Sequence, residues 1–239
     1  MRLLTLLPAL ALAACNAASS AADMDSHSGS IASQRSFDVG AFQSVALGGS
    51  NNVIVHVGGA PSVRAEGPAE ALDRLDIRVE HGVLEIGQKH DWDWSSHKGA
   101  TIYVTTPALE GATIGGSGNM RIDSVSGQRF AVSIGGSGDM EVGTLKVEDA
   151  SFSVAGSGNV KAAGATGKIR ISLVGSGDVD AGALDARNAD VSVAGSGDAV
   201  VRASDNATLS LMGSGDIIVH GTAKCSISKM GSGDARCVG

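Results

Sequence analysis

The sequence predicts an all-β protein: a right-handed parallel β-helix-like solenoid of coils about 20 residues long, preceded by a non-repetitive β-rich N-terminal cap. The first observation behind this prediction is a four-residue motif, Gly-Ser-Gly followed by Asn or Asp, which occurs seven times. Its central serines, from Ser117 to Ser232, are spaced by 20, 20, 19, 20, 18 and 18 residues. Such a period is typical of repeat proteins, in which each repeat buries its apolar face only against its neighbours.

The second observation is a strict alternation of apolar and polar residues ahead of each motif. Apolar residues stand three and five positions before the central serine, and a hydroxyl residue stands between them, as in Val132-Ser133-Ile134. Period-two alternation is typical of a strand with one buried face. We therefore expect an inward apolar set and an outward column of hydroxyl groups. The column comprises Thr113, Ser133, Ser153, Ser172, Ser192, Ser210 and Ser228.

After each motif a second apolar set continues, for example at Met120 and Ile122. Some coils hold a third short run, such as Leu145-Lys146-Val147. Each coil is thus expected to contain two or three short strands, and stacked coils would pair equivalent strands in parallel sheets.

The motif itself has the composition of a tight turn. Its glycines accept positive φ without steric cost, and an Asn or Asp side chain can accept hydrogen bonds from backbone N–H groups. We interpret the last motif residues as structural turn residues, with no metal bound: Asn119, Asp139, Asn159, Asp178, Asp198, Asp216 and Asp234. The alternative is a calcium column, since these carboxylates would stack about 4.8 Å apart. Against it, Asn119 and Asn159 dilute the charge, and the glycine-aspartate pattern of calcium-binding β-rolls is absent.

Residues 36–110 are strand-like but not repetitive, and they are predicted to cap the stack formed by residues 111–239. Short β-branched runs alternate here with Gly, Asn and Pro turns, and Gly48-Gly49-Ser50-Asn51 resembles a degenerate copy of the motif. Between the runs, Pro68 stands at a plausible first helical position ahead of Leu72 and Leu75, which predicts a two-turn helix.

The first residues have the layout of an export signal: Arg2, then an apolar run from Leu3 to Ala13, too short to span a bilayer. Leu12-Ala13-Ala14-Cys15 resembles the lipobox of bacterial lipoproteins, which implies a signal peptide over 1–14, cleavage before Cys15 and lipid on its thiol. The alternative is an ordinary signal cut near Ala14. Asn16, by resemblance to the sorting rule of enteric bacteria, favours the outer membrane. Residues 15–35 are small and polar, which predicts a lipidated flexible tether.

Two further cysteines, Cys225 and Cys237, flank the last motif at inward positions of the alignment. In an oxidising envelope compartment we interpret them as a disulfide that closes the final coil; two free thiols are the alternative. Lys229 replaces an apolar residue in the same coil, so this end of the stack carries a charge and a covalent link.

One polar segment, residues 89–98, concentrates both tryptophans of the chain with two histidines. It could stack a sugar ring on Trp92 or Trp94, or hold a weak metal site through His90 and His97. The alternative is a loop whose aromatic side chains fold back over the cap.

Composition limits the function classes. The formal charge of −7 argues against nucleic acid as a partner, because such proteins cluster Lys and Arg. Aromatic residues are only 3% of the chain, so a protein interface would lack its usual anchors. The histidines form no ligand spacing with the cysteines and no nucleophile constellation, so we predict neither a cofactor nor an enzyme.

Several features together resemble one family: the phenylalanine-led start near Phe37, the short helix, the strands at Val83–Ile86 and Thr101–Val104, and the motif series. They are similar to the DUF2807 family, also described as the putative auto-transporter adhesin head GIN domain. The resemblance covers about residues 36–239. It implies a β-helical bacterial envelope protein of the adhesin type, and it brings no catalytic residues.

The leading hypothesis is therefore a non-catalytic, lipid-anchored envelope lipoprotein that acts as an adhesin or binding scaffold for a glycan or protein ligand. One alternative is a structural envelope component that faces the periplasm. Another is a carbohydrate-processing enzyme, which would need an acidic or basic cluster in a groove along one sheet.

Overall fold

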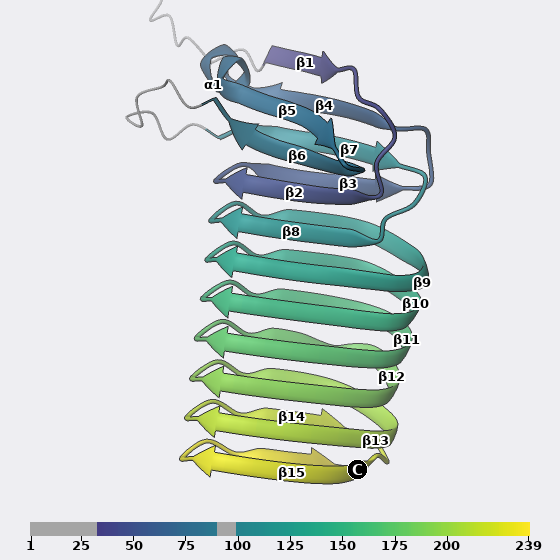
Figure 1. Ribbon diagram of the computed structural model, residues 1–239, viewed down its shortest axis with the longest axis vertical. Coiled ribbons are helices and arrows are strands. Elements are labelled where there is room, and N and C mark those ends of the chain that lie inside the picture. The colour runs from purple at the N-terminus through teal and green to yellow at the C-terminus, as the bar shows by residue number, and fades with distance from the viewer. Residues whose placement is uncertain (1–32, 90–98) are drawn as a thin grey trace, which may run out of the picture. The chain divides into compact units, whose positions relative to one another are not determined.

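The computed structural model describes residues 33–89 and 99–239, which belong to one compact unit. Within this unit the strands lie across a single axis and stack one above another (Figure 1). The chain runs along one face, bends, crosses the other face and reverses at the opposite edge. Across the parts of the chain so described, no helix has the length and apolar character needed to cross a membrane.

Five long strands form the repetitive part of the stack. They are β9 (Met120–Gly136), β10 (Met140–Gly156), β11 (Val160–Gly175), β12 (Val179–Gly195) and β13 (Ala199–Gly213). Neighbouring strands pair in parallel along nearly their whole length, so that equivalent residues of successive coils lie side by side. For these five coils the expectation of two or three separate strands was wrong, because each is one strand of 15 to 17 residues. Parallel pairing holds on both sides of the bend, with small register shifts that absorb the change of direction.

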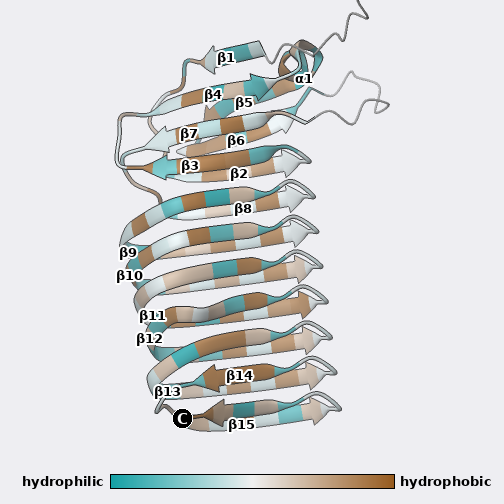
Figure 2. Ribbon diagram, turned by 180° about the vertical axis from the view of Figure 1, so that it is seen from behind, coloured by the Kyte–Doolittle hydropathy of each residue, from teal (hydrophilic) through white to brown (hydrophobic). Residues whose placement is uncertain are grey.

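The core lies between the two faces and follows the predicted alternation. Val132 and Ile134 are buried while Ser133 between them is exposed, and the same pattern repeats in the next four coils. The banding of hydrophobic and hydrophilic residues along each strand is visible in Figure 2. The last coil differs. Its strand β15 (Lys224–Gly231) pairs with β13 alone among the described residues, and Ile227 is 45% exposed.

The parallel stack extends beyond residues 111–239 into the N-terminal section. The strands β2 (Ser44–Gly49) and β3 (Asn52–Val57) flank the degenerate turn, and they pair in parallel with β8 (Gly111–Gly116) and β9. On their other side, β6 (Val83–Gln88) pairs with β2, and β7 (Thr101–Thr106) pairs with β3. The β2–β3 coil therefore lies between two coils that follow it in the sequence.

The remaining N-terminal elements change the pairing from parallel to antiparallel. The strand β1 (Ser33–Phe37) pairs with β4 (Ser62–Gly67), β4 pairs with β7, and β5 (Leu75–Glu80) pairs with β6, all antiparallel. The short helix α1 (Ala69–Arg74) joins β4 to β5 and buries Ala71 and Leu72. Pro68 was expected at the first helical position. It takes the N-cap position instead, with ψ of 142°, and the helix begins at Ala69. At the other end, β14 (Ile217–His220) and β16 (Ala235–Val238) complete the second face.

Candidate functional site

Each Gly-Ser-Gly-Asn/Asp motif forms the reversal at one edge of the stack, where only glycine fits. Gly136 has φ of +147°, and a Cβ on it would lie 2.3 Å from the carbonyl oxygen of Gly116 in the preceding coil. A Cβ on Gly138 would lie 2.0 Å from the oxygen of Gly118. This close approach lets the N–H groups of Ser137 and Gly138 donate to Gly116 O at 2.9 and 3.1 Å. The glycines therefore set the contact between coils.

The Asn and Asp side chains of the motif form a continuous hydrogen-bonded ladder. The Oδ1 atom of each accepts the backbone N–H of the corresponding residue in the next coil, as from Asp198 N to Asp178 Oδ1 at 2.9 Å. Six such bonds of 2.7 to 3.1 Å join Asn119, Asp139, Asn159, Asp178, Asp198, Asp216 and Asp234. Either residue type supplies this oxygen, which explains why Asn and Asp exchange at this position.

The same ladder directs one oxygen of each motif carboxylate from Asp139 to Asp216 toward a backbone N–H. Among residues 33–89 and 99–239, no group of three or more His, Cys, Asp or Glu side chains is arranged to hold a metal ion.

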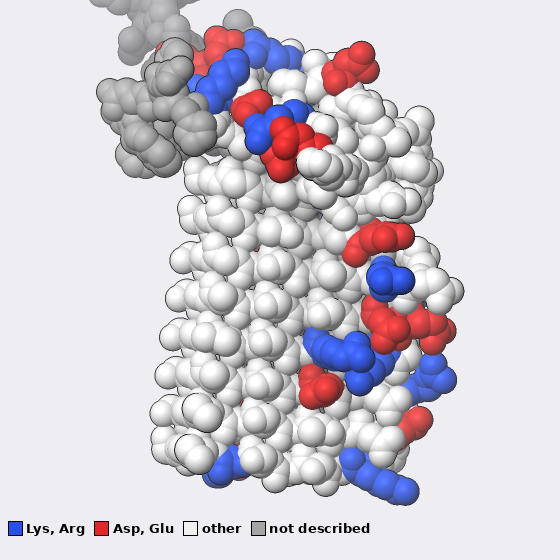
Figure 3. All heavy atoms as spheres, in the orientation of Figure 1, with Lys and Arg blue, Asp and Glu red and all other residues white. Residues whose placement is uncertain are grey.

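A flat, uncharged surface covers the half-coils that precede the motifs (Figure 3). We call it the serine face, and it consists of three outward columns. The first is the hydroxyl column from Thr113 to Ser228, and the third contains the motif serines from Ser117 to Ser232. The column between them is small or apolar: Gly115, Gly135, Ala155, Val174, Ala194, Met212 and Met230. Val174, Met212 and Met230 are 54%, 60% and 70% exposed. Most of the charged groups in this view gather beside the serine face at the bend and around the N-terminal section, and one basic group lies at the last coil.

A trough of about 830 Å³ runs along the bend edge of β10 to β13. Its floor is a column of small, nearly buried residues in register: Val147, Thr166, Ala186 and Ala203. One wall is the row Lys146, Ala165, Asp185 and Arg202. The other wall is the row Glu148, Gly167, Arg187 and Ser204. In both rows β11 contributes no side chain longer than a methyl group, so the walls are notched at the same coil.

Ion pairs connect the charged groups of these walls. Arg187 Nη2 donates to Glu148 Oε2 at 3.0 Å, and Arg202 Nε lies 3.5 Å from Asp185 Oδ1. All four side chains are at least half exposed, so each pair adds at most about 1 kcal/mol to stability. The sequence pattern alone does not predict this trough. Its residues belong to four coils, and only the exact register shows that they are neighbours.

On the other face, His56 Nδ1 contacts Asp123 Oδ2. Burial alone would raise the pKa of Asp123, but hydrogen bonds from Val57 N–H and Ser124 N–H, together with His56, lower it below its ordinary value. The side chain of His56 is 67% exposed and that of Asp123 is 41% exposed. The pair joins β3 to β9 and thereby links the N-terminal section to the repeats.

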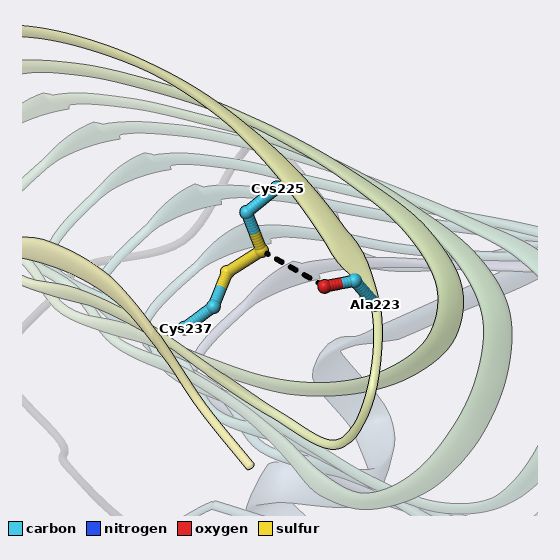
Figure 4. Close-up of a disulfide and its surroundings, with 3 residues drawn as sticks. All are labelled: Ala223, Cys225 and Cys237. Carbon is cyan, nitrogen blue, oxygen red and sulfur yellow. Dashed lines mark hydrogen bonds between the residues drawn. A yellow bond between two sulfur atoms is a disulfide. The ribbon is translucent and has the colours of Figure 1, made fainter.

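Cys225 and Cys237 are joined in a disulfide that links β15 to β16 across the last coil (Figure 4). The two residues continue inward columns of the preceding coil, since Cys225 is in register with Ala207 and Cys237 with Val219. Lys229, in the same coil, donates from Nζ to the oxygen of Gly233 at 2.8 Å.

Five predicted site residues lie outside the described part of the chain: Cys15, the expected lipid attachment site, and the four residues of the tryptophan segment, His90, Trp92, Trp94 and His97. Lipid attachment and ligand binding at these positions stay predictions.

Solved structures of putative adhesins share this fold. One from Bacteroides fragilis has a TM-score of 0.79 and 22% sequence identity, and the match covers 87% of this chain and 97% of the other. One from Parabacteroides distasonis has a TM-score of 0.70 and 20% identity at the same coverage. A structure from the same species titled a putative lipid binding protein has a TM-score of 0.67 and 22% identity, again at 87% and 97% coverage.

No protein with a curated description matches the chain. The model of one protein family matches residues 41–223, which is most of the described unit. That family is described as "Putative auto-transporter adhesin, head GIN domain". With the stacked coils and their glycine turns, this match shows that the chain belongs to the DUF2807 family.

Proposed function

We propose that the protein is a non-catalytic lipoprotein of the bacterial cell envelope that acts as an adhesin or binding scaffold. The observation that carries the proposal is the serine face, an uncharged surface that repeats the same three columns in seven consecutive coils. Family membership supports the same class, since the family and its solved relatives are named as putative adhesins or lipid-binding proteins rather than as enzymes.

The dimensions of the serine face suit many weak contacts. Seven coils about 4.8 Å apart extend over about 29 Å, and three alternate side chains span about 13 Å. The resulting area of about 400 Å² is half of what one partner buries in a standard protein interface. Hydroxyl groups flank an apolar column, so a ligand that offers both hydroxyls and C–H groups would match it, as glycans do. Repetition along the stack provides multivalency.

The enzyme alternative has less support. It requires an acidic or basic cluster in a groove along one sheet, whereas the charged trough lies at the bend. Its two carboxylates, Glu148 and Asp185, already pair with arginines. Our second proposal is that the protein is a structural component of the envelope that faces the periplasm.

Two experiments test the proposal. Protease treatment of intact cells should remove the domain while a periplasmic control protein survives, and full protection would contradict adhesion. Binding of the full chain in detergent micelles to an immobilised glycan array should be lost in a variant with Ser153→Arg and Ser192→Arg, which places charge on the serine face. A matched variant, Lys161→Gln with Arg121→Gln on the opposite face, should bind as the wild type does. Equal binding by both variants would rule out the serine face.

A further inference from the structure

The bend edge differs from the rest of the surface because the coils change length there. The first motif steps are 20 residues and the last two are 18. The missing residues fall at the bend, where the pairing of β12 with β13 skips from Ala181 to Asp185. The trough lies at this edge and crosses both the longer coils, β10 to β12, and the shorter coil of β13.

The trough is long enough for a linear ligand. Its floor runs through four coils and continues to Gly221, so at about 4.8 Å per coil it measures about 19 Å. Small residues keep it open, since the floor residues Val147, Thr166, Ala186 and Ala203 are nearly buried and β11 contributes only Ala165 and Gly167 to the walls. The trough thus accepts an extended chain rather than a compact molecule.

The walls present both kinds of hydrogen-bonding partner. Lys146, Arg187 and Arg202 donate, while Glu148 and Asp185 accept, which gives the trough a formal charge of +1 in a chain of −7. A positive spot on an acidic protein favours an anionic ligand at that spot. The carboxylates, however, would repel a ligand that carries only negative charges and no donors. They favour a ligand with hydroxyl donors beside its acid groups.

We propose that the trough binds an acidic oligosaccharide, a linear glycan of about four sugars with carboxylate groups. Lys146 and Arg202 hold its carboxylates, and its hydroxyls donate to Asp185. The Arg187–Glu148 pair is exposed and spans the β11 notch, so a ligand carboxylate replaces Glu148 on Arg187. An acidic peptide fits less well, because the small residues of the floor form no apolar pocket for its side chains. Its backbone N–H groups can still donate to Asp185, so it is tested beside the glycan.

The test measures binding of three probes to the full chain in detergent micelles by calorimetry: tetragalacturonate, a neutral galactose tetrasaccharide and tetraglutamate. We expect tetragalacturonate to bind best. Lys146→Gln and Arg202→Gln should each weaken it about tenfold, as expected for loss of a charge-assisted hydrogen bond. Glu148→Gln should strengthen it, because Arg187 is released, while Arg187→Gln should weaken it.

Lys161→Gln is the matched control, because Lys161 does not line the trough and its loss removes the same charge. We expect it to leave the affinity unchanged. Thermal melts check that each variant is folded. No binding of tetragalacturonate, equal binding of the neutral probe, or an equal effect of Lys161→Gln and Lys146→Gln would overturn the proposal. Equal binding of tetraglutamate would replace the glycan with an acidic peptide. The trough is separate from the serine face, so either site can fail without the other.

Discussion

Arg187 and Glu148 pair across a coil that lies between them. They belong to β12 and β10, and the intervening strand β11 places Gly167 at the matching register position. A Cβ on Gly167 would lie 2.8 Å from Arg187 Nη2, from Glu148 Oε2 and from the backbone oxygen of Glu148. The absence of a side chain on Gly167 therefore allows the ion pair to form.

Gly167→Val should destabilise the protein by about 1–3 kcal/mol, because the new side chain collides with backbone and displaces the ion pair. Glu148→Gln removes the pair alone and should cost less than about 1 kcal/mol, since both partners are exposed. Urea denaturation followed by circular dichroism measures both. Gly127→Ala is the control, because a Cβ there meets nothing within 4 Å. Equal losses for Gly167→Val and Gly127→Ala would contradict the steric explanation.

Gly156→Ala should be among the most damaging single changes in the repeats. Gly156 has φ of +134°, and its Cβ would lie 2.3 Å from Gly136 O, so the substitution combines backbone strain with a collision between coils. We expect a loss of at least about 3 kcal/mol or failure to fold. The control is Gly135→Ala, at an outward position whose Cβ would lie 4.0 Å from Ile114 O and where the next coil has Ala155. If both variants melt at the same temperature, the turn does not limit the spacing of the coils.

The sequence predicts the regular parts of this fold well. Val132, Ser133 and Ile134 alternate with the period of a strand, so their directions follow from the pattern alone. Asn51, in contrast, occupies a motif position but is buried, whereas Asn119 is exposed. Asn51 Oδ1 accepts the N–H of Ala100, while Asn119 Oδ1 accepts the N–H of Asp139 in the following coil. Ala100 directly precedes β7, which pairs with β3, and no local sequence pattern predicts this neighbour.

The sequence pattern does not predict the trough either. Lys146 and Arg202 are 56 positions apart, and they share a wall because residues 182–184 of β12 have no partner in β13, which shifts the register at the bend. The alternation of buried and exposed residues is less regular at the bend. There the two rows of wall residues point outward on either side of the buried floor column. Which charges become neighbours there depends on the sum of all earlier coil lengths.

Asp178→Ala should lower stability by about 1 kcal/mol, because the N–H of Asp198 loses its partner on the ladder. Asp178→Asn keeps the acceptor and also relieves repulsion from the neighbouring carboxylate, so it should be as stable as the wild type or more so. Thermal melts of both variants at neutral pH and low salt make the comparison. A greater loss in Asp178→Asn than in Asp178→Ala would show that the negative charge, rather than the hydrogen bond, matters here. Adding calcium to the wild type then distinguishes a bound cation from simple screening, which sodium chloride would reproduce.

Asp123 should make stability depend on pH. Its pKa in the folded protein lies below the ordinary value of 3.8, so its contribution is fully present above that value and is lost as the pH falls through the folded pKa. Asp123→Asn should therefore be less stable than the wild type at neutral pH, and the difference should shrink below about pH 3.8. Melting curves of the two proteins between pH 7 and pH 2.5 test this. A difference that stays constant with pH would mean that the carboxylate is not held in its charged form by Val57, Ser124 and His56.

Reduction of the disulfide between Cys225 and Cys237 should loosen the last coil without unfolding the stack. In a solenoid each coil contacts only its neighbours, so the loss stays near β15 and β16. Hydrogen exchange measured by mass spectrometry should speed up over residues 217–239 in reductant and stay unchanged over residues 120–175. A chain with Cys225→Ser and Cys237→Ser should behave like the reduced wild type, and reductant should not affect it further. Two readily labelled thiols in the untreated protein, or faster exchange throughout the stack, would show that the link does not act as a local closure of the final coil.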